Sequence, residues 1–252
     1  MADITELRRQ IDEIDTELVR LYLRRMETAA KIGDYKRQNG LPVYDPRREE
    51  QLLERVSALA GPDHGAGVRE MFRLLMAQSK AWQRLLLSNI VLIGMPGCGK
   101  STVGELAARA LNRPLINTDV LIEKKTGISC GDYIRKYGEA AFRDLETAAI
   151  EEAAAQRGCV IATGGGVVTR PQNMELLRRQ GVVFHILRPL EELEITPERP
   201  LSDTPKKLRA LWEARGPLYE ACRDYAVEGR DAAERAEKVI ALFKKYFLGS
   251  SD

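Results

Sequence analysis

The stretch from Ile90 to Thr102, IVLIGMPGCGKST, constrains the fold of this chain more than any other. The apolar residues Ile90–Ile93 predict a short buried strand, and the pattern G-x-x-x-x-G-K-[ST] follows at once. Glycines in such a loop let backbone N–H groups surround phosphate oxygens, at positions where a Cβ would block the approach. A simple glycine turn is the alternative, but here strand, loop, Lys-Ser-Thr and amphipathic helix all occur in order. The stretch therefore predicts a site for a nucleoside triphosphate.

The loop residues have separate expected roles around the phosphates. Lys100 brings a positive charge to the β- and γ-phosphates, and Ser101 offers a hydroxyl ligand for Mg²⁺. The helix that begins here directs the positive end of its dipole at the same anion. The loop residues expected to contact the nucleotide are Gly97, Cys98, Gly99, Lys100, Ser101 and Thr102.

Composition narrows the class of protein. With 252 residues the chain has room for one large domain or two modest ones, and its net charge is only +2. Because no basic stripe is present, we expect small-molecule substrates and neither nucleic acid nor membrane as partners. The N-terminus is too charged for a signal peptide, and no apolar run reaches the ~20 residues of a membrane span. The scattered cysteines indicate reduced thiols in a cytoplasmic protein; they are Cys98, Cys130, Cys159 and Cys222.

The N-terminal segment begins with a long helical pattern. Apolar residues recur at steps of three and four from Ile4 to Ile32, and the first firm stop is Asn39-Gly40. They predict one helix of about 35 residues, roughly 50 Å long at ~1.5 Å per residue. Because so short a segment cannot cover such a rod alone, we expect a second copy of the chain to pack on it, which gives a homodimer.

Two further helices complete an all-helical segment. Asp45-Pro46 begins the second helix, and the stretch Gly61–Gly65 is expected to end it. A third helix is predicted from about Ala66 to Leu87. Ser79 and Gln83 lie one turn apart on its apolar stripe, so polar groups stand where a core is expected.

Three basic residues of the first helix point to an anionic ligand. Arg25 interrupts the apolar series, and because an unpaired buried guanidinium is costly, a carboxylate of the protein or an anionic ligand must meet it. Lys36 lies on the same side, roughly 16 Å further along the helix. Arg8 lies about 25 Å from Arg25 in the other direction and is rotated by roughly 100°, so only a twofold partner could bring it to the same pocket. The alternative is a set of salt-bridged or solvent-reaching side chains in a coiled-coil-like dimer.

This set of residues resembles the site of the all-helical chorismate mutase family. The match runs from Leu7 to Leu53 and resumes from Phe72 to Gln83. The resemblance implies rearrangement of chorismate to prephenate, which needs no nucleophile and no proton transfer. The family's substrate-binding residues fall on Arg8, Arg25, Lys36, Asp45, Arg48, Glu49, Ser79 and Gln83.

The resemblance also implies catalytic roles. Arg25 and Arg8 of the partner subunit would clamp two carboxylates, Lys36 and Gln83 would donate to the breaking ether oxygen, and Glu49 would accept from the ring hydroxyl. Two alternatives stay open: a regulatory dimerisation domain that binds chorismate or prephenate without turnover, and a pyruvate lyase that acts on isochorismate. Lys36 and Gln83 favour the mutase, because a sensor does not need donors to the ether oxygen.

The C-terminal segment alternates between predicted strands and helices. Such alternation indicates an α/β fold in which helices cover both faces of a parallel sheet, with ligands at the carboxyl ends of the strands. After the loop strand, the predicted strands are Leu115–Asn117, Cys159–Ala162 and Val182–Leu187. The predicted helices run to about Leu111 and over Val120–Tyr137, Ala140–Gln156, Pro171–Gln180, Pro205–Cys222 and Asp231–Phe247.

Motifs at three of these strand ends, together with Phe142-Arg143, resemble shikimate kinase. The motifs are Asn117-Thr118-Asp119, Gly164-Gly165-Gly166, and Arg199-Pro200-Leu201 with Arg215-Gly-Pro-Leu-Tyr. The resemblance implies that ATP phosphorylates the 3-hydroxyl of shikimate with Mg²⁺ present. It implies that Asp119 binds the acceptor's hydroxyls and takes a proton, that Arg143 and Arg215 grip its carboxylate, and that Gly164, Gly165 and Gly166 line its ring. Lys100 and Arg199 would act on the transferring phosphoryl group, and Glu146 would orient Arg143.

Two positions depart from the shikimate kinase pattern. Asn117 stands where an aspartate near Mg²⁺ is usual, which leaves Ser101 as the expected metal ligand. The lid between Leu187 and Arg199 is short and acidic, and the additional arginine expected near adenine is missing. A P-loop kinase for another small hydroxylated substrate is the alternative reading of this segment.

The two resemblances divide the chain between them. We expect a chorismate mutase domain at residues 1–88 and a shikimate kinase domain at residues 89–252. The predicted protein is a bifunctional enzyme of aromatic amino acid biosynthesis. Because the two reactions are not consecutive in that pathway, channelling between the sites is not implied.

Overall fold

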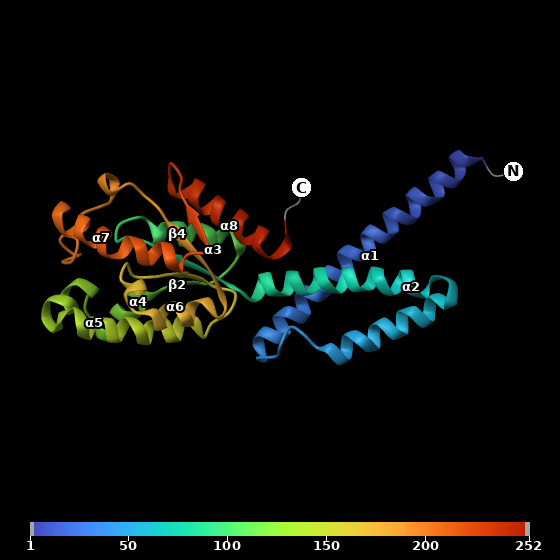
Figure 1. Ribbon diagram of the computed structural model, residues 1–252, viewed down its shortest axis with the longest axis horizontal. Helices are drawn as coiled ribbons and strands as arrows, with labels where there is room; N and C mark the ends of the chain where they lie inside the picture. The colour runs from blue at the N-terminus through green and yellow to red at the C-terminus, as the bar shows by residue number, and fades with distance from the viewer. Residues whose placement is uncertain (1–2, 250–252) are drawn as a thin grey trace. The chain divides into compact units, whose positions relative to one another are not determined.

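The computed structural model describes residues 3–249, which form two compact units that divide between Leu87 and Ser88 (Figure 1). The N-terminal unit is all-helical, and the C-terminal unit has helices around a sheet of five parallel strands. Both predicted fold classes are thereby confirmed. Within the described residues, every helix is too short or too polar to cross a membrane.

Two long helices make up the N-terminal unit. Helix α1 (Ile4–Gln38) has the predicted length of 35 residues, and the side chain of Asp3 caps it by accepting from the N–H of Thr5 at 3.2 Å. Helix α2 (Pro46–Leu87) is interrupted at Gly61, where φ is 74° and ψ is 179°. The unit therefore has three helical arms, as predicted.

The prediction of a loop from Gly61 to about Gly65 is wrong, because helical geometry resumes at Pro62 rather than near Ala66. Proline suits the first turn of a helix, where its missing N–H leaves no acceptor unpaired. Gly65 lies inside this arm and serves close packing, since a Cβ there would lie 2.8 Å from the carbonyl oxygen of Ser57.

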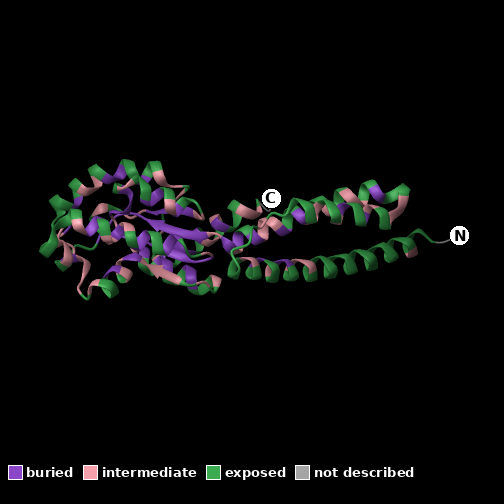
Figure 2. Ribbon diagram, turned by 90° about the horizontal axis from the view of Figure 1, so that it is seen from below, coloured by how far each residue is buried: buried purple, intermediate pink, exposed green. Residues whose placement is uncertain are grey.

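The apolar stripe of α1 is largely uncovered in a single chain. Ile11 is 57% exposed and Ile14 is 53% exposed, whereas further along the helix Ala29 is buried. Figure 2 shows exposed residues along most of this helix. The large apolar residues exposed on α1 are Ile4, Leu7, Ile11, Ile14, Leu18, Val19, Leu21, Tyr22, Leu23, Ile32 and Tyr35.

The sheet of the C-terminal unit has the strand order β2-β3-β1-β4-β5. The phosphate-loop strand β1 lies at its centre, parallel to β3 and β4, and every residue of β1 is buried. The carboxyl ends of the strands consequently meet at one edge of the sheet. The strands are β1 (Asn89–Ile93), β2 (Leu115–Asn117), β3 (Val160–Ala162), β4 (Gly181–Ile186) and β5 (Tyr225–Val227).

Helices cover both faces of this sheet. Helix α3 packs against α8, and α5 packs against α6 on the opposite side (Figure 1). The helices are α3 (Lys100–Leu111), α4 (Thr118–Thr126), α5 (Cys130–Ala154), α6 (Pro171–Arg178), α7 (Pro205–Cys222) and α8 (Ala232–Leu248). Two short 3₁₀ turns, η1 (Val167–Thr169) and η2 (Leu190–Glu192), complete the unit.

The helical stretch predicted over Val120–Tyr137 is divided in the structure, because two helices occupy this region. Gly127 ends α4 in the left-handed conformation, and the Ser129 side chain caps α5 by accepting from the N–H of Asp132 at 3.1 Å. Helix α5 then continues past the expected break, although Gly138 is non-helical with φ 86° and ψ 163°. Strand β5 was not predicted.

Candidate active sites

The phosphate loop joins β1 to α3 with its glycines in conformations that other residues rarely adopt. Gly97 has φ 80° and Gly99 has φ 93°. Lys100 is buried, and its Nζ donates to the carbonyl oxygens of Gly94 and Met95 at 2.9 Å each. Because both acceptors are neutral carbonyls, the ammonium keeps its positive charge available to an anion.

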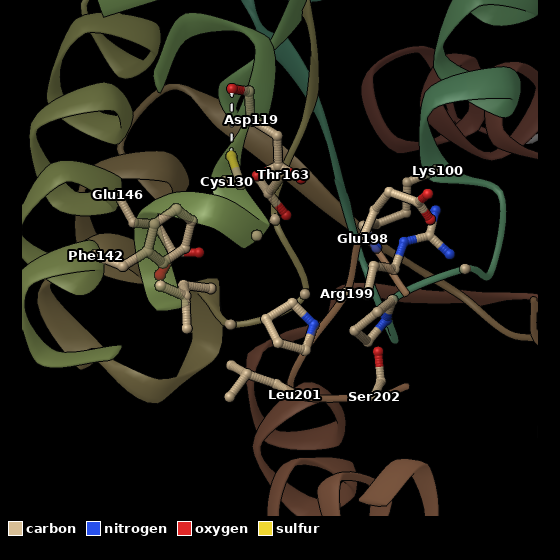
Figure 3. Close-up of a pocket in the computed structure, with 18 of the residues that line it drawn as sticks. Lys100, Asp119, Cys130, Phe142, Glu146, Thr163, Glu198, Arg199, Leu201 and Ser202 are labelled. Carbon is tan, nitrogen blue, oxygen red and sulfur yellow. Dashed lines mark hydrogen bonds between the residues drawn. The ribbon is translucent and has the colours of Figure 1, made fainter. Parts of the chain in front are cut away.

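One cavity of about 250 Å³ joins this loop to the other strand ends. Figure 3 shows Lys100 and Arg199 at one end of it and Phe142 and Glu146 at the other. Cys98 is the predicted kinase-site residue that does not line the cavity, since its side chain is fully buried beneath the loop. The predicted residues that line it are Gly97, Gly99, Lys100, Ser101, Thr102, Asp119, Arg143, Gly164, Gly165, Gly166, Arg199 and Arg215.

Asp119 follows β2 in the first turn of α4. The side chain of Asn117 caps this helix, because its Oδ1 accepts from the N–H of Asp119 at 3.0 Å. Burial raises the pKa of Asp119, and the positive charge of Lys100 opposes that effect. A carboxylate with raised proton affinity is the better general base for a hydroxyl proton.

The amide nitrogen of the Asn117 side chain also forms a hydrogen bond. This Nδ2 donates to Ser101 Oγ at 3.0 Å, which fixes the hydroxyl that is expected to bind Mg²⁺. Asn117 does not itself line the cavity. The residue that departs from the shikimate kinase pattern therefore acts on Ser101 through a hydrogen bond.

Arg143 and Arg215 meet in the same cavity, held by carboxylates. Arg143 Nη1 donates to Glu146 Oε2 at 2.8 Å, so the expected ion pair between these residues is present. Burial alone would lower the pKa of Arg143, but the carboxylates of Glu146 and Glu139 raise it overall. Burial lowers the pKa of Arg215, whose Nη1 donates to the carbonyl oxygen of Gly165 at 3.3 Å.

The three glycines after β3 are required by close approach. A Cβ on Gly164 would lie 2.7 Å from Asp119 Oδ1 and 2.9 Å from Glu146 Oε1, and a Cβ on Gly166 would overlap the guanidinium of Arg143. The backbone of these glycines therefore lies in direct contact with the side chains of Asp119, Glu146 and Arg143.

The lid brings Arg199 to the cavity. Its Nη1 donates to the carbonyl oxygen of Glu194 at 3.1 Å, and its side chain is 39% exposed. A Cβ on Gly97 would lie 2.9 Å from that same carbonyl oxygen, so the lid touches the phosphate loop.

A second cavity, of about 270 Å³, lies within the N-terminal unit. It brings together residues from α1 and from both arms of α2. Arg8 is outside it, on the exposed part of α1. The predicted residues that line it are Arg25, Lys36, Asp45, Arg48, Glu49, Ser79 and Gln83.

The cations of this cavity are held mainly by neutral groups. Arg25 Nη1 donates to the carbonyl oxygen of Leu75 at 3.0 Å and to Ser79 Oγ, and burial lowers the pKa of Arg25. Lys36 Nζ donates to the carbonyl oxygen of Val43 at 2.7 Å. Among the described residues, Gln83 Oε1 is buried without a hydrogen-bond partner.

Two charged residues near these sites were missed by sequence reasoning. Lys80 lines the second cavity, with its Nζ 3.0 Å from Glu49 and 5.0 Å from the ring centroid of Tyr44. Glu139 contacts both arginines of the first cavity. The only signal for Glu139 in the sequence is its position one helical turn before Arg143.

Two family models match separate parts of the chain. The family model described as shikimate kinase matches residues 96–244, and the model described as chorismate mutase type II matches residues 7–84. The shikimate kinase of Caldanaerobacter subterraneus subsp. tengcongensis is 42% identical over 168 residues, which are 63% of this chain and 98% of that protein. The shikimate kinase of Thermodesulfovibrio yellowstonii is 37% identical over 174 residues, which are 66% of this chain and 100% of that protein.

Solved structures agree with the sequence comparisons. Shikimate kinase from Acinetobacter baumannii in complex with shikimate has a TM-score of 0.61 and 36% identity, covering 67% of this chain and 99% of that one. Shikimate kinase from Aquifex aeolicus has a TM-score of 0.57 and 32% identity, covering 64% of this chain and 99% of that one. The chain belongs to the shikimate kinase family and carries a chorismate mutase type II domain at its N-terminus.

Proposed function

We propose that this protein is a bifunctional enzyme that phosphorylates shikimate at its 3-hydroxyl with ATP and, at a separate site, rearranges chorismate to prephenate. The observation that carries the kinase half is the single cavity that holds the phosphate loop, Asp119 and two converging arginines. The observation that carries the mutase half is the helical cavity lined by Arg25, Lys36 and Gln83.

ATP and Mg²⁺ fit the residues around the phosphate loop. Positive φ values at Gly97 and Gly99 suit a backbone that surrounds phosphate oxygens, and Lys100 supplies the charge. Ser101 would hold Mg²⁺, which commonly takes one or two protein oxygens and completes its shell with phosphate and water. When bound, Mg²⁺ neutralises charge that develops on the phosphates.

A third cavity, of about 700 Å³, supports the placement of the nucleoside. It is lined by Arg188, Pro189 and Arg230, among others. Arg235, on the helix that begins just after Arg230, reaches to 3.9 Å from a Cβ placed on Gly99. Arg235 Nε also donates at 3.1 Å to the carbonyl oxygen of Gly229, which lines this cavity, so the base and ribose would extend from the phosphate loop toward it.

The acceptor binds at the other side of the loop. Arg143 and Arg215 hold its carboxylate, and the backbone of Gly164, Gly165 and Gly166 lines its ring. Asp119 holds the acceptor's hydroxyls and accepts the proton of the 3-hydroxyl as its oxygen attacks the γ-phosphorus. Arg199 of the lid stabilises the negative charge spread over the transferring phosphoryl group.

The mutase cavity binds a compact dianion. Arg25 and Arg8 of the partner subunit clamp its two carboxylates, while Asp45, Arg48 and Ser79 complete the binding set. Lys36 and Gln83 donate to the ether oxygen as its bond breaks, and Glu49 accepts from the ring hydroxyl. Because proton transfer plays no part, positioning and electrostatics supply the whole rate enhancement.

The mutase site requires a homodimer. The uncovered apolar stripe of α1 is the surface through which two chains would pack, and the same contact would bring Arg8 to the partner's cavity. The four cysteines form no disulfide within the described residues, which fits the reducing cytoplasm, where we place the enzyme.

Separate assays test the two halves. Purified chain is assayed for ATP-dependent phosphorylation of shikimate and for conversion of chorismate to prephenate. Asp119→Asn is expected to abolish only the first activity, and Gln83→Ala only the second. A wild-type chain that binds chorismate without consuming it would establish the regulatory alternative for the helical domain, and release of pyruvate would establish the lyase.

A further inference from the structure

One carboxylate oxygen bridges the two arginines that hold the acceptor's carboxylate. Glu139 Oε1 accepts from Arg143 Nη2 at 2.6 Å and from Arg143 Nε at 3.2 Å. It also accepts from Arg215 Nη2 at 3.3 Å. Both guanidinium side chains are almost buried, with 9% and 7% exposure. The point where they meet is therefore occupied by a carboxylate of the chain itself.

The charges of this cluster are balanced before any substrate enters. The guanidiniums of Arg143 and Arg215 face the carboxylates of Glu139 and Glu146. A substrate carboxylate would add a third negative charge to a cluster with little access to water, where uncompensated charge is costly. The same cavity also holds the acidic Asp119 and the basic Lys100 and Arg199. The entering anion and the resident carboxylates therefore compete for the same guanidinium donors.

Glu139 can leave and Glu146 cannot. The Glu146 side chain is 0% exposed, whereas that of Glu139 is 44% exposed. Glu139 directly follows Gly138, the non-helical residue of α5, and is not among the residues that line the cavity. Its side chain can therefore rotate into solvent while Glu146 keeps its bond to Arg143.

We propose that Glu139 is an internal occupant of the point where Arg143 and Arg215 meet, beside the cavity, and that the substrate's carboxylate displaces it from both guanidiniums. This inference rests on the proposed kinase function. Glu139 keeps the two buried guanidiniums paired while the acceptor is absent. Because every anion that binds these arginines must compete with Glu139, the dissociation constant of each anion rises by the same factor. The substrate also contacts Asp119 and the glycines, whereas a small anion has only the arginines.

The test compares ligand affinity in full-length variants. Glu139→Ala removes the occupant, Glu139→Gln keeps its size without its charge, and Glu151→Gln is the matched control on an exposed part of the same helix. Shikimate binding is measured by calorimetry. Acetate binding is measured separately, by NMR of the arginine Nε–H signals, because acetate probes the arginines alone. Thermal unfolding confirms that each variant is folded.

Removal of a partly exposed ion pair predicts a dissociation constant for shikimate ~3- to 10-fold lower in Glu139→Ala, with a smaller decrease in Glu139→Gln. Acetate is expected to bind more tightly by a similar factor, and Glu151→Gln is expected to match the wild type. Unchanged or weaker binding of both ligands in folded Glu139→Ala would overturn the proposal, because Glu139 would then only support the arginines. If Glu139→Ala does not fold, the Glu139→Gln result decides.

The two possible failures can be told apart. If wild-type protein neither binds nor phosphorylates shikimate, the proposed kinase function fails, while the acetate titration still reports on Glu139. If wild-type protein phosphorylates shikimate and Glu139→Ala binds both ligands no better, only the internal occupant fails.

Discussion

A methyl group added at Gly164 should disable the kinase without unfolding it. A Cβ at this position would lie 2.7 Å from Asp119 Oδ1 and 2.9 Å from Glu146 Oε1, whereas ordinary contact begins at about 3.4 Å. The two oxygens must therefore retreat by about 0.7 Å and about 0.5 Å. Gly164 has no positive φ, so Ala adds no backbone strain.

Both displaced oxygens matter for the reaction. Asp119 is the proposed base, and Glu146 holds Arg143, so the acceptor's hydroxyl and carboxylate would be misplaced together. Catalytic groups tolerate only ~0.5 Å of misplacement, and ~1 Å costs on the order of 100-fold. We expect kcat/KM for shikimate to fall ~10- to 100-fold in Gly164→Ala.

The assay has two internal controls in the same chain. The KM for ATP should change little, because the phosphate loop is untouched, and chorismate mutase activity should be unchanged. A kcat/KM for shikimate within about threefold of wild type, in folded Gly164→Ala, would show that the geometry around Asp119 is not limiting.

Four further predictions follow from the two cavities. Gln83→Ala should lower the mutase kcat by ~10²- to 10³-fold and change KM far less, because its amide acts on charge that develops in the transition state; equal losses in binding of substrate and transition state would contradict this. Asp119→Asn should raise the Tm, by ~2–4 °C for each kcal/mol of unfolding free energy that the buried carboxylate had removed. The reason is that burial raises the pKa of Asp119 in the folded state, so the ionised carboxylate destabilises that state. This destabilisation grows as the pH rises from the unfolded-state pKa through the folded-state pKa, and it persists at neutral pH. The increase in Tm should therefore vanish when unfolding is measured at acid pH. Asn117→Asp should lower the Mg²⁺ concentration for half-maximal kinase rate, because a carboxylate replaces the amide beside Ser101, and an unchanged requirement would argue against any role at this position. Lys80→Met should raise the KM for chorismate ~3- to 10-fold, since the cavity loses a half-buried positive charge, and an unaltered KM would mean that Lys80 only pairs with Glu49.

The parts of the fold that sequence reasoning predicted are those with local signals. The phosphate loop, the strand Leu115–Asn117 and the helix Pro205–Cys222 depend on short-range patterns and were found with correct bounds. Strand β5 was missed because it has only three residues and its middle residue, Ala226, is exposed. Gly61-Pro62 predicts a loop by its composition, but proline also suits the first turn of a helix, and helical geometry resumes at Pro62.

The residues missed at the sites depend on distant neighbours. Glu139 reaches Arg215 across 76 positions of sequence, and Lys80 reaches Glu49 across 31. Such pairs carry no periodic signal, because the tertiary fold alone brings them together. By contrast, the family resemblance named Arg143 and Arg215 individually, yet it gave no indication that a carboxylate stands between them.

The absence of Arg8 from its own chain's helical cavity has a consequence for mixed assemblies. In the proposed dimer, if one chain carries Arg8→Ala and the other carries Gln83→Ala, one mutase site would carry both defects and the other would carry neither. Two inactive preparations would then regain mutase turnover when their subunits are exchanged. The residues that line the kinase cavity all belong to the C-terminal unit of one chain. Kinase activity should therefore not change when the subunits are exchanged.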